Sequence, residues 1–241
     1  MATIHLILQG KGGVGKSMIA ALIAQYKLSK GKRSLCIDTD PVNASFEAYK
    51  RLQVSRLSIV QDEEIDPRSF DQLIEQIAKA KDDVIIDNGA TSFVPLSAYV
   101  ITNQVPALLR DMGHQVVVHT VITGGQAQSD TLHGFTQLVK QFPADVSFVV
   151  WLNPYWGPIE RDGKPFEQMK AYSAHKDRVS AIVRLPELKH ETFGRDFSDM
   201  LQAHLTFDEA IALPSLTIMT RQRLSILKKQ LFEQFSAVPV L

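Results

Sequence analysis

Short apolar runs recur along the chain and alternate with longer segments whose apolar residues follow helical spacing. The runs do not alternate with polar residues, which is typical of strands buried on both faces of a parallel sheet. We therefore expect strands over residues 4–8, 35–37, 84–86, 116–121 and 146–152. We expect helices over residues 16–29, 69–81, 96–112, 129–141 and 165–176.

Strands and helices that alternate through short connections predict an α/β fold with a doubly wound, mostly parallel β-sheet flanked by helices. No repeat, low-complexity tract or flexible linker interrupts the chain, so we expect residues 1–241 to form a single domain. Ligands of such sheets bind outside the carboxyl ends of the strands. The polar residues and glycines that end the predicted strands are therefore the candidates for a functional site.

Composition narrows the class of protein. The 241 residues include 26 basic and 26 acidic ones, and 45% are hydrophobic, as expected for a soluble globular enzyme rather than a strongly nucleic-acid-directed chain. Cys36 is the one cysteine, which excludes an intramolecular disulfide and favours a reducing compartment. The sequence starts without the pattern of a secretory signal and contains no apolar stretch of about twenty residues. We therefore expect a cytoplasmic protein.

The segment after the first predicted strand has the spacing G-x-x-x-x-G-K-[ST], which is typical of the phosphate loop of a P-loop NTPase fold. Glycines let backbone N–H groups converge on phosphate oxygens, and the helix that follows adds favourable charge. We expect ATP or ADP with Mg²⁺, with Lys16 at the β and γ phosphates and Ser17 on the metal. A glycine-rich turn of purely structural use is the alternative. The residues expected to contact the nucleotide are Gly10, Lys11, Gly12, Gly13, Val14, Gly15, Lys16, Ser17 and Met18.

Lys11 is a second lysine inside this loop, at a position where an ordinary phosphate loop requires no charge. A solvated surface charge is one interpretation. The loop also resembles the deviant Walker A motif of the ParA/MinD superfamily, which includes partition ATPases, the nitrogenase iron protein and the arsenite and tail-anchored-protein ATPases. This resemblance implies a nucleotide-dependent homodimer in which Lys11 reaches the partner's phosphates and supplies charge in trans, as an arginine finger does.

Two aspartates, Asp38 and Asp40, follow the second predicted strand and precede Pro41. Turn chemistry before a proline would account for them. The segment also resembles the superfamily's switch I motif, D-x-D-P. By this resemblance Asp40 would orient or activate the attacking water, and Asp38 would help to order the ligand shell of Mg²⁺.

The third predicted strand is followed by Asp87, Asn88 and Gly89, and Asp87 fits the Walker B carboxylate that holds Mg²⁺ directly or through water. We therefore expect Ser17, Asp38 and Asp87 at the metal site. Gly89 could offer its backbone amide to the γ-phosphate and so sense hydrolysis. Asn88 departs from the resemblance, because partition ATPases usually carry threonine and proline after this aspartate.

Asn153 follows the strand predicted over residues 146–152 and precedes a proline. The segment resembles the superfamily strand that ends in an asparagine reading the edge of adenine. An amide donates and accepts hydrogen bonds at once, which suits a purine. An Asn-Pro turn at a strand end is the structural alternative.

The C-terminal stretch, residues 221–235, has apolar residues at helical spacing with basic residues between them. Three interpretations are open: a helix packed on the sheet with solvated charges, a basic surface that holds DNA non-specifically, or membrane attachment. Membrane attachment is the weakest of the three, because the basic residues are few.

Other chemistries find little support in the sequence. Seven scattered histidines lack metal-ligand spacing, which argues against a zinc site, and one cysteine cannot supply an Fe–S cluster. Four segments, residues 10–18, 38–44, 85–90 and 151–160, also resemble a family of conjugative-transfer proteins of broad-host-range plasmids. This resemblance implies association with plasmid transfer and with conjugation proteins.

These observations lead to two main hypotheses. In the first, the protein is a slow ATPase with Lys11, Lys16 and Asp40 as catalytic residues, in which ATP and Mg²⁺ close a dimer and hydrolysis reopens it. In the second, the fold binds nucleotide without hydrolysis and serves as an interaction platform of the transfer apparatus, as the departure at Asn88 suggests. A small-molecule ligase or kinase of the same superfamily is a third hypothesis, for which we can name no substrate residues.

Overall fold

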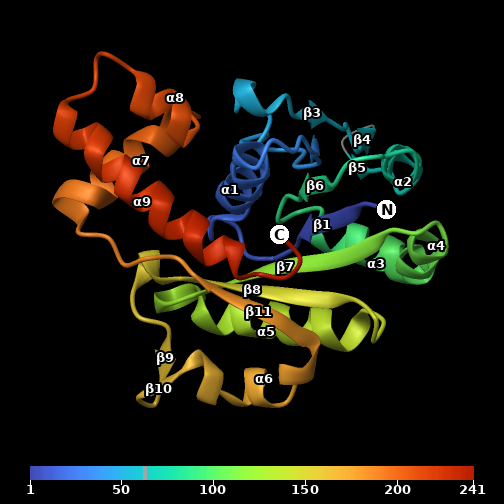
Figure 1. Ribbon diagram of the computed structural model, residues 1–241. Helices are drawn as coiled ribbons and strands as arrows, with labels where there is room; N and C mark the ends of the chain where they lie inside the picture. Colours follow the sequence, from blue (N-terminus) through green and yellow to red (C-terminus); the bar gives the residue numbers. More distant parts are fainter. Residues whose placement is uncertain (62–63) are drawn as a thin grey trace.

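A seven-stranded sheet forms the centre of the protein in the computed structural model, which describes residues 1–61 and 64–241 (Figure 1). The strand order is β11-β8-β7-β1-β6-β2-β3, and every neighbouring pair runs parallel. Two small hairpins lie outside this sheet, β4 with β5 and β9 with β10. The strands are β1 (Thr3–Ile7), β2 (Leu35–Asp38), β3 (Ser55–Arg56), β4 (Val60–Gln61), β5 (Glu64–Ile65), β6 (Val84–Asp87), β7 (Gln115–Thr123), β8 (Ser147–Asn153), β9 (Glu160–Arg161), β10 (Lys164–Pro165) and β11 (Val179–Arg184).

Helices cover both faces of the sheet (Figure 1). One face carries α1 (Lys16–Ser29), α7 (Arg195–Gln202), α8 (Phe207–Ala212) and α9 (Ile218–Ser236). The other face carries α2 (Ser69–Ala78), α3 (Phe93–Thr102), α4 (Val105–Asp111), α5 (Gln128–Gln141) and α6 (Lys170–Ser173). Short 3₁₀ turns are η1 (Lys50–Leu52), η2 (Gly125–Ala127), η3 (Pro154–Trp156), η4 (Phe166–Gln168) and η5 (Lys176–Arg178), and η6 (His190–Gly194) is a π-turn.

Successive residues of the central strands point to opposite faces and so build two cores. Val118 and Val150 pack with the α3 and α5 side, whereas Val117 and Val149 pack with the α1 and α9 side. All four side chains are fully buried. Burial on both faces explains the apolar runs in the sequence, and the expectation of a doubly wound parallel sheet flanked by helices is confirmed.

The single helix expected over residues 96–112 is wrong, because the chain forms α3 and α4 there. Gln104 has a φ of 51°, in the left-handed region, which cannot continue a right-handed helix. Pro106 lies in the first turn of α4, where its missing N–H leaves no helical hydrogen bond unmade. Apolar periodicity continues across the break, so periodicity alone could not locate it.

The helix expected over residues 165–176 is also largely wrong. Asp162 and Gly163 have φ values of 53° and 70° and close the hairpin between β9 and β10, as an Asp-Gly pair favours. The chain then forms η4, the four-residue helix α6 and η5. Strand β11, at the edge of the sheet beside β8, was not anticipated from the sequence.

A chain of hydrogen bonds between aromatic side chains crosses the buried centre of the sheet. The indole of Trp151 donates to Nδ1 of His119 at 3.0 Å, and Nε2 of His119 lies 2.9 Å from Nδ1 of His5. Since Nδ1 of His119 accepts from Trp151, its Nε2 carries the proton and donates to His5. Burial lowers the pKa of both histidines, that of His119 to about 3. Both rings are therefore neutral at pH 7.

This pair makes folding sensitive to acid. Between pH 6.5 and the lowered pKa, an unfolded histidine binds a proton that the folded one excludes, so the free energy of unfolding falls as the pH falls. We expect His119→Gln to be less stable than the wild type at pH 7.5, with the gap narrowing by about 2 kcal/mol at pH 5. Urea unfolding across this range measures the gap. The exposed His133 provides the control variant His133→Gln, and a gap that stays constant with pH would contradict the prediction.

Candidate functional site

The phosphate loop connects β1 to α1 at the carboxyl edge of the sheet. Gly13 and Gly15 have φ values of 72° and 102°, which only glycine adopts without strain. Residues 10–13 are exposed to solvent. Among the described residues, no backbone hydrogen bond uses an N–H of residues 10–15. The loop therefore presents free N–H groups at a helix N-terminus, the arrangement that binds phosphate.

Lys16 begins α1 and folds back over the loop. Its side chain is buried, and Nζ donates to the backbone carbonyl of Lys11 at 3.1 Å. Burial lowers the pKa of Lys16, and the nearby carboxylates of Asp87 and Asp40 oppose this by raising it. The structure therefore brings the predicted phosphate-binding lysine together with two of the predicted carboxylates.

Asp87 ends β6 beside β1 and is 1% exposed. Neither of its carboxylate oxygens has a hydrogen-bond partner within the described part of the chain. Burial raises the pKa of Asp87 to about 7, while the neighbouring Ser17 hydroxyl and the Lys16 ammonium lower it. An orphaned carboxylate beside a hydroxyl is a set of hard oxygen donors suited to Mg²⁺. The residues present thus fit the metal that the sequence predicts.

Asp38, at the end of β2, uses both carboxylate oxygens locally. One oxygen accepts from the backbone N–H of Asp40 at 2.9 Å, and the other accepts from those of Phe46 and Glu47, each at 3.0 Å. Burial raises the pKa of Asp38 despite these bonds. This side chain holds the loop after β2, so any effect on a metal would pass through the position of that loop.

Asp40 faces the loop after β6. One carboxylate oxygen accepts from the N–H groups of Val42 at 2.9 Å and Asn43 at 3.0 Å. A Cβ at Gly89 would lie 2.7 Å from this carboxylate, so a larger residue there would displace the Asp40 side chain. The segment after β2, which resembles switch I, and the segment after β6 thus lie in direct contact.

Asn88, the departure from the superfamily pattern, is fully buried and joins three segments. Its Oδ1 accepts from the hydroxyls of Thr39 at 3.2 Å and Ser92 at 2.8 Å, and its Nδ2 donates to the carbonyl of Gly89 at 3.0 Å. The asparagine therefore ties the end of β2 to the start of α3. Movement of either segment would require these bonds to rearrange.

Asn153 ends β8 and contacts the phosphate loop from the side. Its Nδ2 donates to the carbonyl of Val14 at 2.9 Å, and its Oδ1 accepts from the N–H of Tyr155 at 3.2 Å. The Asn-Pro turn expected as the structural alternative is present, because the chain enters η3 at Pro154. The amide is held at the loop by contacts within this chain.

Lys11 lies on the exposed side of the loop, where Nζ forms an ion pair with Asp130 at 2.8 Å. Asp130 lies in the first turn of α5. Both side chains are substantially exposed. The second lysine of the loop therefore has a partner in its own chain. In the sequence, this ion pair was indicated only by the acidic residue in the first turn of α5.

Sequence reasoning also missed Gln9 and the aromatic side chain of Trp156. Gln9 is buried, and its Nε2 donates to the carbonyls of Val121 at 2.9 Å and Thr131 at 3.2 Å, which fixes the start of the loop against β7 and α5. The indole of Trp156 lies 3.5 Å from the carbonyl of Gly13. A polar residue after an apolar strand was the signal for Gln9.

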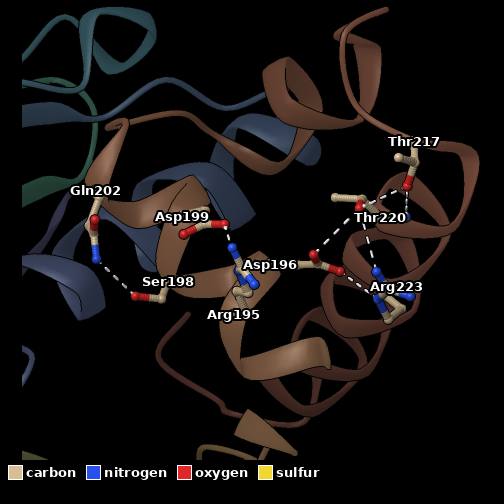
Figure 2. Close-up of polar contacts among 8 residues, drawn as sticks. All are labelled: Arg195, Asp196, Ser198, Asp199, Gln202, Thr217, Thr220 and Arg223. Carbon is tan, nitrogen blue, oxygen red and sulfur yellow. Dashed lines mark hydrogen bonds and ion pairs between the residues drawn. The ribbon is translucent and has the colours of Figure 1, made fainter. Parts of the chain in front are cut away.

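The basic residues of α9 are largely neutralised by neighbouring carboxylates. Figure 2 shows Arg223 against Asp196 of α7, with Thr220 of α9 between them. Lys228 pairs with Asp208 of α8, and Lys229 pairs with Glu233 one turn along α9. This pattern fits a helix packed against its neighbours. Within residues 1–61 and 64–241, no helix combines the length and apolarity needed to cross a bilayer.

Comparisons with known proteins agree with this site. Residues 5–119 match the family described as the CobQ/CobB/MinD/ParA nucleotide binding domain. Two proteins named TraL from Escherichia coli are each 68% identical over 241 residues, with full coverage of both chains. The chain belongs to the TraL family. MobD of Acidithiobacillus ferrooxidans is a more distant relative, 26% identical over 226 residues and covering 92% of each chain.

Solved structures support the fold. MinD from the MinC:MinD cell division complex of Aquifex aeolicus matches with a TM-score of 0.55 at 16% identity, covering 97% of this chain and 96% of that one. The septum site-determining protein MinD of Pyrococcus horikoshii, complexed with Mg-ADP, also has a TM-score of 0.55 at 16% identity, with coverage of 99% and 98%. The chain therefore shares the fold of these MinD structures.

The raised pKa of the buried Asp87 carboxylate predicts that the free energy of unfolding depends on pH. A raised pKa means that the folded protein retains a proton that the unfolded chain releases, so the free energy of unfolding falls as the pH rises from about 4 to about 7. We expect Asp87→Asn to stabilise the nucleotide-free protein by up to about 4 kcal/mol at pH 8, and by about 2 kcal/mol at pH 5. Urea unfolding measures both, with the exposed Asp82→Asn as control. A destabilised Asp87→Asn at pH 8 would contradict this account.

Proposed function

We propose that the protein binds ATP with Mg²⁺ and uses slow hydrolysis to switch between a monomer and a dimer. The observation that carries the proposal is the convergence of Lys16 and the unpartnered carboxylate of Asp87 beside a phosphate loop whose N–H groups are free. A cation-bearing triphosphate would satisfy the free N–H groups and the orphaned carboxylate together.

Each residue at the strand ends has a proposed task. The loop amides and Lys16 bind the phosphates, and Ser17 with Asp87 would hold Mg²⁺, which supplies charge neutralisation at the β and γ phosphates when bound. Asp38 positions the segment after β2 through its backbone bonds. Asp40 would orient the attacking water.

The contact between Asp40 and Gly89 supports a γ-phosphate sensor at the carboxyl edge. The two residues follow adjacent strands, β2 and β6, and β6 also pairs with β1. The N–H of Gly89 would donate a hydrogen bond to the γ-phosphate. Loss of the γ-phosphate on hydrolysis would break this bond and release the segment that leads into α3. Asn153 would recognise the adenine edge after its side-chain amide exchanges the hydrogen bond to Val14 for one to the base.

Dimer formation would transfer Lys11 from Asp130 to the phosphates of a second subunit. The exposed position of Lys11 supports this role, because an ion pair open to solvent contributes little and is readily exchanged. A phosphate bears more charge than a carboxylate and would compete well for the ammonium. The contact with Asp130 therefore holds Lys11 in a resting position.

The cellular setting that we propose is plasmid conjugation, with conjugation proteins as partners. The support is the 68% identity to the TraL proteins together with the resemblance of the four segments to the transfer family. Non-specific DNA binding through α9 is the weaker part of the proposal, because Arg223 is largely buried against Asp196, and Lys228 and Lys229 also have carboxylates beside them. We propose a location in the cytoplasm.

Three variants test the switch. With Mg²⁺ and ATP, light scattering should show dimers for the wild type and more persistent dimers for Asp40→Ala, since loss of hydrolysis prevents reopening. Lys16→Ala should weaken nucleotide binding about 10- to 100-fold, as the loss of a charge-assisted bond predicts. Lys11→Ala should bind nucleotide as a monomer and fail to dimerise. Monomers of both the wild type and Asp40→Ala would overturn the proposal.

The platform hypothesis has one observation in its favour, the set of hydrogen bonds around Asn88. If these bonds hold the segment after β6 rigidly, nucleotide could bind without triggering hydrolysis. Phosphate release by the wild type above the background of Lys16→Ala would exclude this alternative. Equal release by the two proteins would favour it.

Asp130→Asn should promote dimer formation, because it frees Lys11 without altering the phosphate loop. We expect the protein concentration for half-dimerisation in Mg²⁺ and a non-hydrolysable ATP analogue to fall about two- to tenfold. Glu75→Gln is the matched control, since it removes another exposed ion pair, with Lys79 on α2. An unchanged or higher concentration for Asp130→Asn would show that this contact does not restrain Lys11.

A further inference from the structure

Exposed apolar side chains surround the phosphate loop. Val42 follows β2, Val94 starts α3 after β6, and Tyr155 and Trp156 follow β8. These four therefore lie at the carboxyl edge of the sheet, around the exposed residues 10–13 of the loop. Tyr155 and Trp156, which we call the aromatic pair, have 70% and 56% of their surface exposed. Aromatic side chains this open to solvent are typical of an interface that the isolated chain leaves uncovered.

The aromatic pair is carried by a closely packed stretch of backbone. The two rings pack edge to face with centroids 4.9 Å apart. Behind them the backbone of η3 lies directly on two glycines, because a Cβ at Gly124 would lie 2.2 Å from the carbonyl oxygen of Gly157, and one at Gly125 would lie 2.5 Å from that of Trp156. A rigid, preorganised aromatic surface loses little entropy when a partner covers it.

Trp156 lies on the outer side of the phosphate loop. Its indole approaches the carbonyl oxygen of Gly13, at 3.5 Å. More than half of the Trp156 surface remains exposed while its indole touches Gly13, which is itself exposed. A ring in this position is available to a macromolecule that covers the loop rather than to the phosphates within it.

The aromatic pair lies on the same side of the loop as Lys11. Gly125 packs on the backbone of Trp156 and begins η2, which leads directly into α5. The first turn of α5 carries Asp130, the partner of Lys11. Lys11, Asp130 and Trp156 thus belong to one set of contacts beside residues 10–13. A subunit that received Lys11 would also meet the aromatic pair.

We infer that Tyr155 and Trp156 form the aromatic contact by which a second copy of this chain docks over the phosphate loop. The inference rests on the proposed nucleotide-dependent dimer and adds the surface that holds it. In a two-fold dimer each contact occurs twice, so the pair would act on both sides of the interface. Tyr and Trp are enriched among the residues that dominate interface energies.

The first test compares Trp156→Ala with the control Met112→Ala. Met112 is also exposed but lies just before β7, at the amino edge of the sheet. In Mg²⁺ and a non-hydrolysable ATP analogue, we expect Trp156→Ala to raise the concentration for half-dimerisation about tenfold or more, as for a residue that dominates an interface. Met112→Ala should match the wild type. Sedimentation velocity measures dimerisation, and a fluorescent analogue measures nucleotide binding below the dimerisation range.

The outcomes separate the inference from the proposed function. Unchanged dimerisation of Trp156→Ala beside a wild type that dimerises would overturn the inference alone. If Trp156→Ala weakened nucleotide binding by the monomer as much as it weakened dimerisation, Trp156 would be assigned to nucleotide binding. This result would also overturn the inference. A wild type that never dimerises would refute the proposed switch, and the inference with it.

Tryptophan fluorescence provides an independent readout on the unmodified protein. Trp151 is fully buried and Trp156 is exposed, so acrylamide should quench Trp156 selectively. If a second copy covers the ring, protection from quenching in the presence of the analogue should increase with protein concentration and follow the dimer fraction. Protection that is complete in the dilute monomer would assign the ring to the nucleotide, and unchanged quenching in the dimer would overturn the inference.

Discussion

The phosphate loop must leave its backbone N–H groups free for an anion, and this constraint organises its surroundings. Lys16, Asn153 and Trp156 each approach a carbonyl oxygen of the loop, at 3.1, 2.9 and 3.5 Å. The ring of Phe93 packs on the backbone of Gly10 without using a hydrogen bond. The loop is therefore held in shape from its carbonyl side while its donors stay open. The elements β6, β8, α1 and α3 each contribute one of these supports or a carboxylate beside them.

The same edge of the sheet concentrates charge that the fold alone does not satisfy. Asp87 is buried without a hydrogen-bond partner, and Lys16 is buried between carboxylates at the strand ends. Removing charged groups from water is unfavourable unless they are paired, so the folded chain carries a cost here that a bound cation and polyphosphate would offset. Nucleotide and metal would thus complete the fold at this edge, which gives ligand binding a direct effect on stability. The hydrogen bonds of Asn88 join the segments after β2 and β6 to the start of α3 beside this edge.

Much of the architecture could be predicted because strands buried on both faces of a parallel sheet appear in the sequence as continuous apolar runs. The five predicted strands are all present, with ends that differ by at most two residues. The failures occur where one residue overrides the pattern. Gln104 adopts a left-handed backbone within an apolar stretch and divides the expected helix in two. Asp162 and Gly163 turn the chain into a hairpin just before a segment that has helical spacing. Strand β11 depends on pairing with β8 and was missed.

The sequence by itself determined the class of site, because the spacing of Gly10 to Ser17 and the acidic residues after two strands encode chemistry in local order. Only the tertiary structure decided which groups meet. It paired Lys11 with Asp130, separated by 119 positions, set Gly89 against Asp40, and laid Trp156 on Gly13. Such contacts depend on which strands are neighbours and how the loops after them are held. Chain spacing carries no information on either, since both arise from packing between segments that are remote in sequence.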